Sequence, residues 1–272
     1  MGSIVLSLTT IPGRVKYLEH VLRSIERQTV KPHRIELNLP LEYNKRPFRA
    51  AERSAIPSDF DVFECTDVGP ATKVLPTLKR YTGTEQKIVY CDDDRNFQKD
   101  WLKRLSDYSE RNPGSAIADE CHTIKAIEYR YNHPKKDMKY RLKRGLSLGL
   151  YDPRGKNLGS CCNVALGYGG VLVKPSFFNK QAQNVPDIVW SVDDIWLSAN
   201  ILATGADIKW TNRKEWQRTR SLRVGSVDVG RQADALSVSS FDGYNRVMAD
   251  HYAVNYCKKH LGVWLGSPQK LV

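Results

Sequence analysis

Long apolar runs are missing from this 272-residue sequence. No stretch reaches the roughly 18 consecutive apolar residues that a membrane-spanning helix needs. Residues 1–5 also lack the basic region and the long apolar stretch of a signal peptide. We therefore expect a protein without a membrane span that stays in the cytoplasm.

Cysteine is sparse and follows no pattern. The six cysteines form neither a CxxC pair nor a dense framework, which argues against structural disulfides and against a zinc site. No stretch rich in glycine, proline or serine marks a linker, and no segment is repeated. Because the length suffices for one substantial hydrophobic core, we expect a single domain over residues 1–272.

Acidic residues are fewer than basic residues in this sequence. The sequence holds 42 Lys and Arg against 30 Asp and Glu, which gives a formal net charge of +12. Such an excess attracts anionic ligands, among them nucleotides, nucleic acid and acidic lipid headgroups. Charge alone does not choose among these classes.

Strand and helix patterns alternate in the first half of the chain. Residues 4–8, 35–39, 62–65 and 88–91 are short apolar or alternating segments, and each predicts a strand. Between them apolar residues recur at helical spacing, as in residues 18–25. This alternation predicts an α/β fold with a largely parallel sheet that is covered on both faces.

The second half of the chain is less regular. Residues 116–118 and 170–173 are strand candidates. We expect a helix that begins near Ser191 and ends at Gly205, and a last helix that carries residues 244–252.

Three aspartates, Asp92, Asp93 and Asp94, directly follow the apolar strand that ends at Cys91. Ligands of open α/β sheets bind beyond the carboxyl ends of the strands, and clustered carboxylates there suit Mg²⁺ or Mn²⁺ that also bridges phosphates. The pattern therefore predicts a nucleotide site. The alternative is a solvated acidic turn that caps the following helix, since aspartate near a helix start is favourable by itself.

Four segments of the chain together resemble the GT-A glycosyltransferases, in particular the bacterial family 2-like enzymes of polysaccharide and lipopolysaccharide assembly. Residues 7–14 look like the first strand and donor-binding loop, and residues 67–73 like the segment that approaches the donor nucleotide. Residues 92–94 look like the metal-binding DxD motif, and residues 193–197 like the acidic pair that holds the catalytic base.

The resemblance implies a Rossmann-like GT-A fold, with a mixed, mostly parallel central sheet flanked by helices. Residues 1–115 would then bind mainly the donor nucleotide, and residues 116–272 mainly the acceptor. Beyond about residue 202 the chain matches no motif of the family.

The same resemblance implies a donor site at Thr9, Thr10, Pro12, Arg14, Asp67, Lys73, Asp92 and Asp93. It also implies a manganese or magnesium ion on Asp94 and Asp92, which agrees with the need to neutralise a departing diphosphate. Lys73 and Arg14 each follow a turn and can meet phosphate. Each also has the alternative of an ordinary surface charge.

The pair Asp193 and Asp194 lies at the expected start of a helix, where the macrodipole favours ionised carboxylates. An ionised carboxylate can accept the proton of an acceptor hydroxyl while that oxygen attacks the anomeric carbon, with inversion. The resemblance favours the second position, Asp194, as the base. Because the first position is Asp193 where the family usually has glutamate, the choice between the two aspartates stays open. The alternative is helix capping, with Ser191 in a near capping box.

Two further features have less specific patterns. Gly169 and Gly170 precede an apolar strand, where the resemblance places the meeting of donor sugar and acceptor, and a tight turn is the alternative. His251 matches the late histidine that completes the metal site of some GT-A enzymes. A core or surface histidine is its alternative.

Two basic stretches remain. Residues 135–144 suit contact with anionic lipid or with an acidic acceptor. The stretch from Trp216 to Arg223 occupies the position of a loop that folds over the donor. A solvated basic face is the alternative for each.

Taken together, the sequence predicts a metal-dependent, inverting glycosyltransferase that uses a nucleotide-diphosphate sugar, with a UDP-sugar favoured. The expected acceptor is a glycan or a lipid-linked glycan at the inner face of the membrane, and no nucleic acid is expected. Two rival functions remain, a metal-dependent nucleotidyltransferase or phosphohydrolase and a basic nucleic-acid-binding protein.

Overall fold

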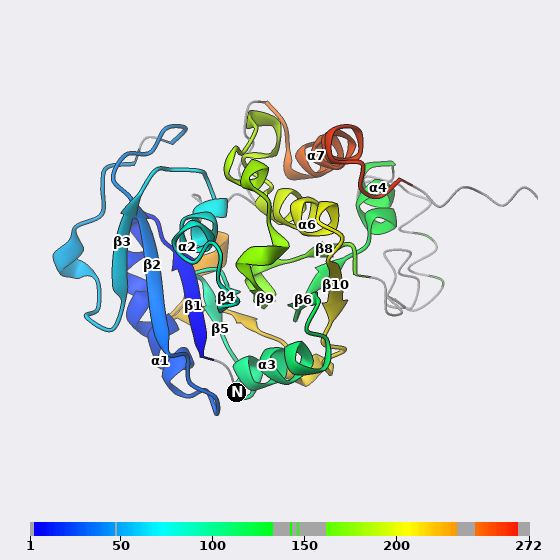
Figure 1. The fold of residues 1–272 in the computed structure, drawn as a ribbon. Coiled ribbons are helices and arrows are strands. Elements are labelled where there is room, and N and C mark those ends of the chain that lie inside the picture. Colours follow the sequence, from blue (N-terminus) through cyan, green and yellow to red (C-terminus); the bar gives the residue numbers. More distant parts are fainter. Residues whose placement is uncertain are drawn as a thin grey trace, which may run out of the picture.

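The computed structural model describes residues 3–46, 48–132, 142, 146, 162–232 and 243–265. A seven-stranded sheet in the order β10-β6-β9-β4-β1-β2-β3 forms its centre (Figure 1). The strands are β1 Ile4–Thr9, β2 Arg34–Pro40, β3 Asp61–Cys65, β4 Lys87–Tyr90, β6 Ser115–Ala118, β9 Val171–Val173 and β10 Asp207–Trp210.

The sheet is parallel except at one strand. Parallel pairs join β1 to β2 and β4, β2 to β3, and β6 to β10. The exception is β9, which runs antiparallel to both of its neighbours, β4 and β6. The predicted class, a mixed and mostly parallel α/β sheet flanked by helices, is confirmed, and the arrangement is consistent with a Rossmann-like GT-A fold.

Helices cover both faces of the sheet because the side chains of a strand alternate between the faces. On one face, Ile4, Leu6 and Leu8 of β1 pack with helices α1 (Leu18–Glu26) and α3 (Trp101–Arg111). On the other face, Val5 belongs to the cluster of α2 (Leu75–Arg80) and α6 (Asp193–Ala203). The apolar strand patterns therefore supply two cores, one on each side.

A third layer lies over α6. Helices α4 (Ile124–Asn132) and α7 (Arg246–Leu261) pack against α6 in a separate apolar cluster, and Figure 1 shows these three helices together at one end of the molecule. Every residue of α6 from Asp193 to Ile201 is buried as a result. The last helix is confirmed, but it begins after Tyr244, and its buried residues are Ala249, Asp250, Ala253, Val254 and Cys257.

Short strands that periodicity did not predict form further two-stranded pairs. Strand β5 (Arg95–Asn96) pairs with β11 (Arg220–Ser221), and β12 (Arg223–Val224) pairs with β13 (Val227–Asp228). Strand β7 (Cys121–His122) pairs with β8 (Val164–Ala165). Two residues are too few to show a period of two, and the β5–β11 and β7–β8 pairs join segments far apart in sequence.

One edge of the sheet collects the predicted motifs. Because β1 and β4 are parallel neighbours, the residues that follow them, Thr10 and Asp92, lie at the same edge. Strand β9 runs the other way, so it is its beginning, at Gly170, that lies at this edge. Ligands of such sheets bind at this edge.

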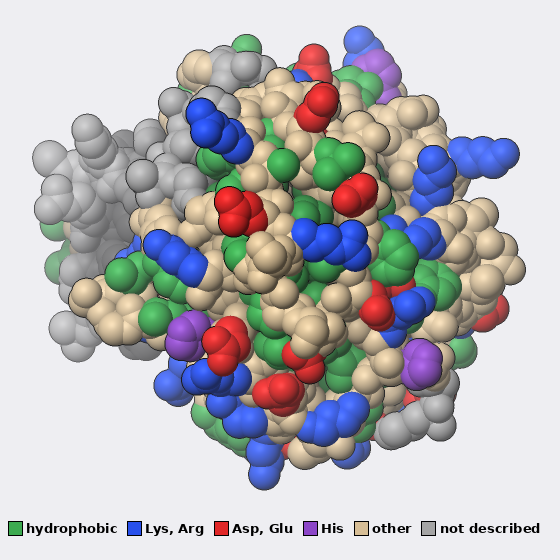
Figure 2. All heavy atoms as spheres, turned by 90° about the vertical axis from the view of Figure 1, so that its left-hand side faces the viewer, with side chains coloured by type: hydrophobic (Ala, Val, Ile, Leu, Met, Phe, Trp, Pro, Cys, Tyr) green, Lys and Arg blue, Asp and Glu red, His purple; other side chains and the backbone are tan. Residues whose placement is uncertain are grey.

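The remaining surface features bear on the expectations from composition. The sequence predicts no membrane-spanning helix. Among the described residues, no helix combines the length and the apolar character required to cross a bilayer. The described cysteines Cys65, Cys91, Cys121, Cys162 and Cys257 are free thiols, and Cys161 lies outside the described residues. On the face beside β3, basic and acidic side chains of the described residues are intermixed (Figure 2), so the positive excess does not gather there. Of the basic stretch 135–144, every residue but Leu142 lies outside the described residues.

Candidate active site

A cleft of about 920 Å³ opens at the carboxyl edge of the sheet. Ten of the predicted site residues line it: Thr9, Thr10, Arg14, Asp67, Lys73, Asp92, Asp93, Asp94, Asp193 and Asp194. They come from both halves of the sequence, so the structure brings the predicted donor residues and the predicted base into one cavity.

Two of the three aspartates after β4, Asp93 and Asp94, are held by the segment that follows β1. Thr10 Oγ1 donates to Asp93 Oδ2 at 2.6 Å. Arg14 Nη1 lies 3.0 Å from Asp93 Oδ1 and 3.2 Å from Asp94 Oδ2. The 3-10 helix Pro12–Tyr17 places Arg14 there, since Pro12 has a φ suited to a helix start. Arg14 is therefore a buried partner of the aspartates rather than a surface charge.

The surroundings shift the pKa values of the three aspartates in different directions. Burial, together with repulsion from Asp92 and Asp93, raises the pKa of Asp94 to about 7. Burial also raises the pKa of Asp93, against the opposing effect of Arg14. Burial acts on Asp92 in the same sense, but Lys73 outweighs it and lowers the pKa of Asp92. Arg14 and Lys73 thus compensate only part of the negative charge of Asp92, Asp93 and Asp94.

Lys73 connects the aspartates to α6. Its Nζ lies 2.6 Å from Asp92 Oδ1, 3.0 Å from Asp193 Oδ2 and 3.7 Å from Asp194 Oδ1. The side chain is only 4% exposed, so the alternative of a solvated surface lysine is wrong. Gly167 makes room for it, because a Cβ at that position would collide with Lys73 Nζ.

Asp193 and Asp194 occupy the first turn of α6. Asp194 Oδ1 accepts a hydrogen bond from the Gly167 backbone N–H at 2.9 Å. No side-chain hydrogen bond caps this helix, and its N-cap residue is Val192, so the predicted capping alternative with Ser191 is wrong. The acidic pair is placed for something other than capping.

The ionisation state expected for Asp194 needs correction. The helix dipole was expected to keep this carboxyl ionised. Burial is the larger effect, and with repulsion from Asp193 and Asp92 it raises the pKa of Asp194 to about 7, although Lys73 opposes the change. At neutral pH the carboxyl is therefore near its titration midpoint.

Asp67 shapes the opposite wall of the cleft. Its two carboxylate oxygens accept hydrogen bonds from the backbone N–H groups of Gly69, at 2.8 Å, and Asn44, at 3.1 Å. Gly69 has a positive φ of 68°, and a Cβ there would lie 2.7 Å from the Trp190 ring. The turn that leads to Lys73 therefore requires glycine.

Four predicted residues lie elsewhere or have another role. Pro12 does not line the cleft. Gly169 and Gly170 do not line it either: a Cβ on Gly169 would collide with Glu120, and one on Gly170, with φ of 89°, would collide with Trp101. Their small size has a packing reason.

His251, the predicted additional metal ligand, also lies outside the cleft lining. Its ring stacks on Tyr131 with ring centroids 3.7 Å apart. Its Nε2 is 3.0 Å from Asn255 Nδ2. Among the described residues, no group of three or more His, Cys, Asp or Glu side chains converges in a way that would hold a metal by itself.

The basic stretch after α6 lies beside the aspartates. Through the β5–β11 pairing, Leu222 N donates to Asp94 O at 2.7 Å, and Arg95 Nη2 donates to Thr219 O at 3.2 Å. Arg218, Arg220 and Arg223 line the cleft. The predicted position of this stretch near the donor end is thus consistent with its contacts, whereas Trp216 is exposed.

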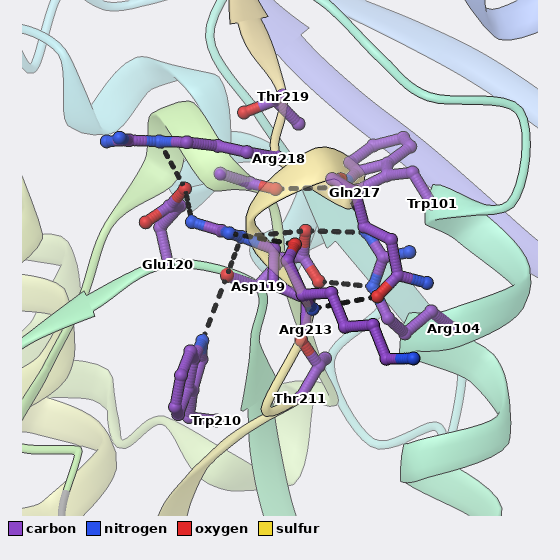
Figure 3. A network of polar contacts seen from close by, with 12 residues as sticks. Trp101, Arg104, Asp119, Glu120, Trp210, Thr211, Arg213, Gln217, Arg218 and Thr219 are labelled. Atoms are coloured by element: carbon purple, nitrogen blue, oxygen red, sulfur yellow. Dashed lines mark hydrogen bonds and ion pairs between the residues drawn. The ribbon is translucent and has the colours of Figure 1, made fainter. Parts of the chain in front are cut away.

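An ion-pair network anchors that stretch (Figure 3). Asp119, at the end of β6, accepts two hydrogen bonds from Arg104, at 2.7 and 2.8 Å, and one from Thr211 Oγ1 at 2.6 Å. The next residue, Glu120, pairs with Arg213 and lies 2.9 Å from Arg218 Nε. The network ties the segment after β10 to the sheet and to α3.

Sequence reasoning missed several cleft residues. Arg95 lies over the ring of Tyr168, 4.8 Å from its centroid, and both line the cleft. Arg130 of α4 and Arg246 of α7 line it from another side. Arg95 directly follows the three aspartates, whereas no local pattern marks Arg130 or Arg246, which belong to helices far away in sequence.

The comparisons with known proteins find a similarity of structure and no match in sequence. No family model matches the chain, and no curated protein matches it. Among solved structures, the chain is similar to the crystal structure of S. aureus TarS, with 14% sequence identity and a TM-score of 0.48. The match covers 82% of this chain and 37% of the TarS chain, so this chain spans little more than a third of TarS. The residues of the cleft, rather than this likeness, carry the functional assignment.

Proposed function

We propose that this chain is a metal-dependent glycosyltransferase that moves a sugar from a nucleotide diphosphate, a UDP-sugar in the first instance, to an acceptor hydroxyl with inversion. One observation carries the proposal. A continuous row of charges, Asp94, Asp92, Lys73 and then the Asp193–Asp194 pair, lies in a single cleft. One end of the row suits a phosphate-bound cation, and the other suits a general base.

The residues at the first end fit Mn²⁺ or Mg²⁺. Asp94 and Asp92 line the cleft, and burial, followed by repulsion from Asp92 and Asp93, raises the pKa of Asp94. Hard carboxylate oxygens suit these ions, which take further ligands from phosphates and water. When bound, the ion would neutralise the charge that develops on the leaving diphosphate.

The chain's own cations act on the same charge. Arg14 lies against Asp93 and Asp94, and its guanidinium can turn one edge toward a phosphate. Arg220 and Arg223 approach from β11 and β12. We propose that these arginines orient the diphosphate, and that Thr9, Thr10 and Asp67 contact the nucleoside.

At the other end, Asp194 is the proposed base. A pKa of about 7 suits a group that must be partly ionised at neutral pH and still hold a proton strongly. The acceptor hydroxyl gives its proton to Asp194, its oxygen bonds to the anomeric carbon, and the bond from that carbon to the diphosphate breaks with its electron pair. The N–H of Gly167 orients the carboxylate, and Lys73 Nζ pairs with the neighbouring Asp193 at 3.0 Å.

Binding of nucleotides tests the donor end. We would titrate UDP, GDP, CMP and TDP by calorimetry, with and without Mn²⁺, into the wild type and Asp94→Asn. The expected result is metal-dependent binding of one nucleotide diphosphate that Asp94→Asn loses. Asp207→Asn, an exposed aspartate on the outermost strand, is the matched control. A folded wild type that binds none of the nucleotides would sink the proposal.

Transfer itself tests the base. With a donor identified, Asp194→Asn should bind it as the wild type does and transfer no sugar, and the product anomer reports inversion or retention. Release of pyrophosphate from a nucleotide triphosphate would instead favour the nucleotidyltransferase alternative.

We also propose that the acceptor is a glycan or a lipid-linked glycan at the inner face of the membrane. The net charge of +12 supports this, since anionic headgroups attract a basic protein. Equal sedimentation with neutral and anionic liposomes would argue against it.

A further inference from the structure

Two arginines from different helices line the same cleft as the Asp193–Asp194 pair. Arg130 lies near the end of α4, Arg246 is the first residue of α7, and both line the cleft. Arg246 Nη1 donates to Ser191 O at 3.2 Å, just before α6. Burial by itself would lower the pKa of Arg246, but the nearby Asp250, Asp194 and Asp193 raise it. Arg246 therefore lies beside the proposed base.

A single carboxylate holds both guanidinium groups. Arg246 Nε lies 2.9 Å from Asp250 Oδ1, and Arg130 Nη2 lies 3.3 Å from Asp250 Oδ2. Asp250 is 6% exposed, whereas the side chains of Arg130 and Arg246 are 29% and 32% exposed. The buried acid thus fixes two arginines that both reach the cleft, and the three groups together keep one net positive charge.

This positive group is distinct from the donor end of the cleft. At the donor end, Arg14 Nη1 lies 3.2 Å from Asp94 Oδ2, whereas Arg246 pairs with Asp250 of its own helix. Lys73 and the acidic pair lie between the two ends. An anion bound at Arg130 and Arg246 therefore belongs to the second substrate, on the side where the proposed base receives its proton.

The surroundings indicate the chemistry of the ligand. Guanidinium groups present planar sets of donors that match phosphate oxygens. Ile127 and Ile195, which belong to the apolar cluster of α4, α6 and α7, also line the cleft. A phosphate with carbon-rich neighbours fits such a wall better than a bare, fully hydrated ion.

We propose that Arg130 and Arg246 form a subsite for a phosphate group of the acceptor. Its assignment to the acceptor rests on the proposed glycosyltransferase function. Asp250 is a positioning residue that holds the two guanidinium groups apart and oriented. The phosphate comes either from a phosphodiester in a glycan or from a lipid headgroup.

Binding of glycerol 3-phosphate by the full chain, with glycerol as the uncharged twin, tests the subsite. We would measure both by calorimetry with and without saturating UDP and Mn²⁺. The expected result is binding of the phosphate compound alone, weakened at least about tenfold in Arg130→Gln, a loss typical of a charge-assisted contact. UDP binding should be unchanged in that variant.

Further variants keep the test independent of folding. Arg130→Gln leaves Asp250 paired with Arg246. Arg246→Lys retains the charge but loses the planar fork, and should also bind glycerol 3-phosphate more weakly. Arg23→Gln is the matched control, since Arg23 likewise pairs with an acid four residues away on a helix and lies outside the cleft. It should behave as the wild type.

The outcomes separate the two proposals. Equal affinity of wild type and Arg130→Gln, or displacement of UDP by glycerol 3-phosphate, overturns the subsite. If no nucleotide binds, the glycosyltransferase proposal is overturned. If glycerol 3-phosphate still binds the wild type and only the Arg130 and Arg246 variants lose that binding, the subsite is supported all the same. Sedimentation with phosphatidylglycerol vesicles that Arg130→Gln abolishes identifies a lipid headgroup, and binding of the soluble compound alone identifies a glycan phosphate.

Discussion

Lys73 Nζ lies 2.6 Å from Asp92 Oδ1, and this contact joins the segment after β4 to the start of α6, because the same ammonium group lies 3.0 Å from Asp193. The proposed cation site and the proposed base thus share one buried positive charge. The Lys73 side chain is only 4% exposed, so solvent screens its attraction to these carboxylates only weakly.

Removal of that charge should destabilise the protein. Lys73→Met leaves three carboxylates without their common partner, and loss of one member of a buried ion pair costs about 3 kcal/mol or more. Urea unfolding at neutral pH measures it. Lys103→Gln, which breaks an exposed pair with Asp107, should change the free energy of unfolding by less than about 0.5 kcal/mol. Equal effects of the two substitutions would contradict this role of Lys73.

Asp194→Asn should stabilise the protein at about pH 8 and abolish transfer. The folded pKa of about 7 exceeds the unfolded value of about 3.9. Between these values the folded state holds a proton that the unfolded state has released. The stability contributed by this group is therefore fully present below about pH 3.9 and is lost as the pH rises through about 7.

Unfolding curves across this pH range, measured without nucleotide, should show the wild type losing more stability than Asp194→Asn by on the order of a few kcal/mol. Transfer by the wild type should increase with pH through about 7 as Asp194 loses its proton. A parallel pH dependence of stability in the two proteins would show that Asp194 is not perturbed.

The Gly69 turn offers a matched pair of substitutions. Gly69→Ala places a methyl group against the Trp190 ring at a positive φ, and should cost about 3 kcal/mol from strain and overpacking together. Gly83 also has a positive φ but nothing within 4 Å, so Gly83→Ala should cost only about 1 to 2 kcal/mol. Thermal unfolding measures the difference. Nucleotide affinity should fall in Gly69→Ala alone, because the turn leads to Lys73.

The Asp119 network should hold the basic stretch in place. Asp119 is fully buried, and Asp119→Asn leaves Arg104 and Arg213 without their full counter-charge, at a cost of about 3 kcal/mol. Hydrogen exchange should rise in residues 211–221 relative to the rest of the chain. Asp207→Asn on β10, which is exposed, should leave both quantities unchanged. Uniform exchange across the Asp119→Asn variant would show that the network does not act on this segment.

The sequence predicted the elements whose pattern is long enough to read. β1, α1, β2 and β4 follow their apolar spacing, because burial on one or both faces imposes a period of 2.0 or 3.6. The three aspartates after β4 could be found for the same reason. They follow a recognisable buried strand, and strand ends gather at one edge of a parallel sheet.

Contacts between residues far apart in sequence could not be predicted from apolar spacing. The pairing of Arg95 with Ser221 and the convergence of Arg130 and Arg246 on Asp250 have no local signature. The glycines before β9 could be seen, but whether they face a ligand or pack on Trp101 depends on a helix that is far away in sequence.

Patterns among near neighbours along the chain are enough to predict the α/β alternation, the carboxylates at the end of β4 and the acidic pair at the start of α6. The place of Lys73 among those carboxylates, and the larger effect of burial than of the helix dipole on the pKa of Asp194, follow from the folded arrangement. Desolvation and charge pairing depend on every group within a few ångströms in space, and most of those groups are far away in sequence.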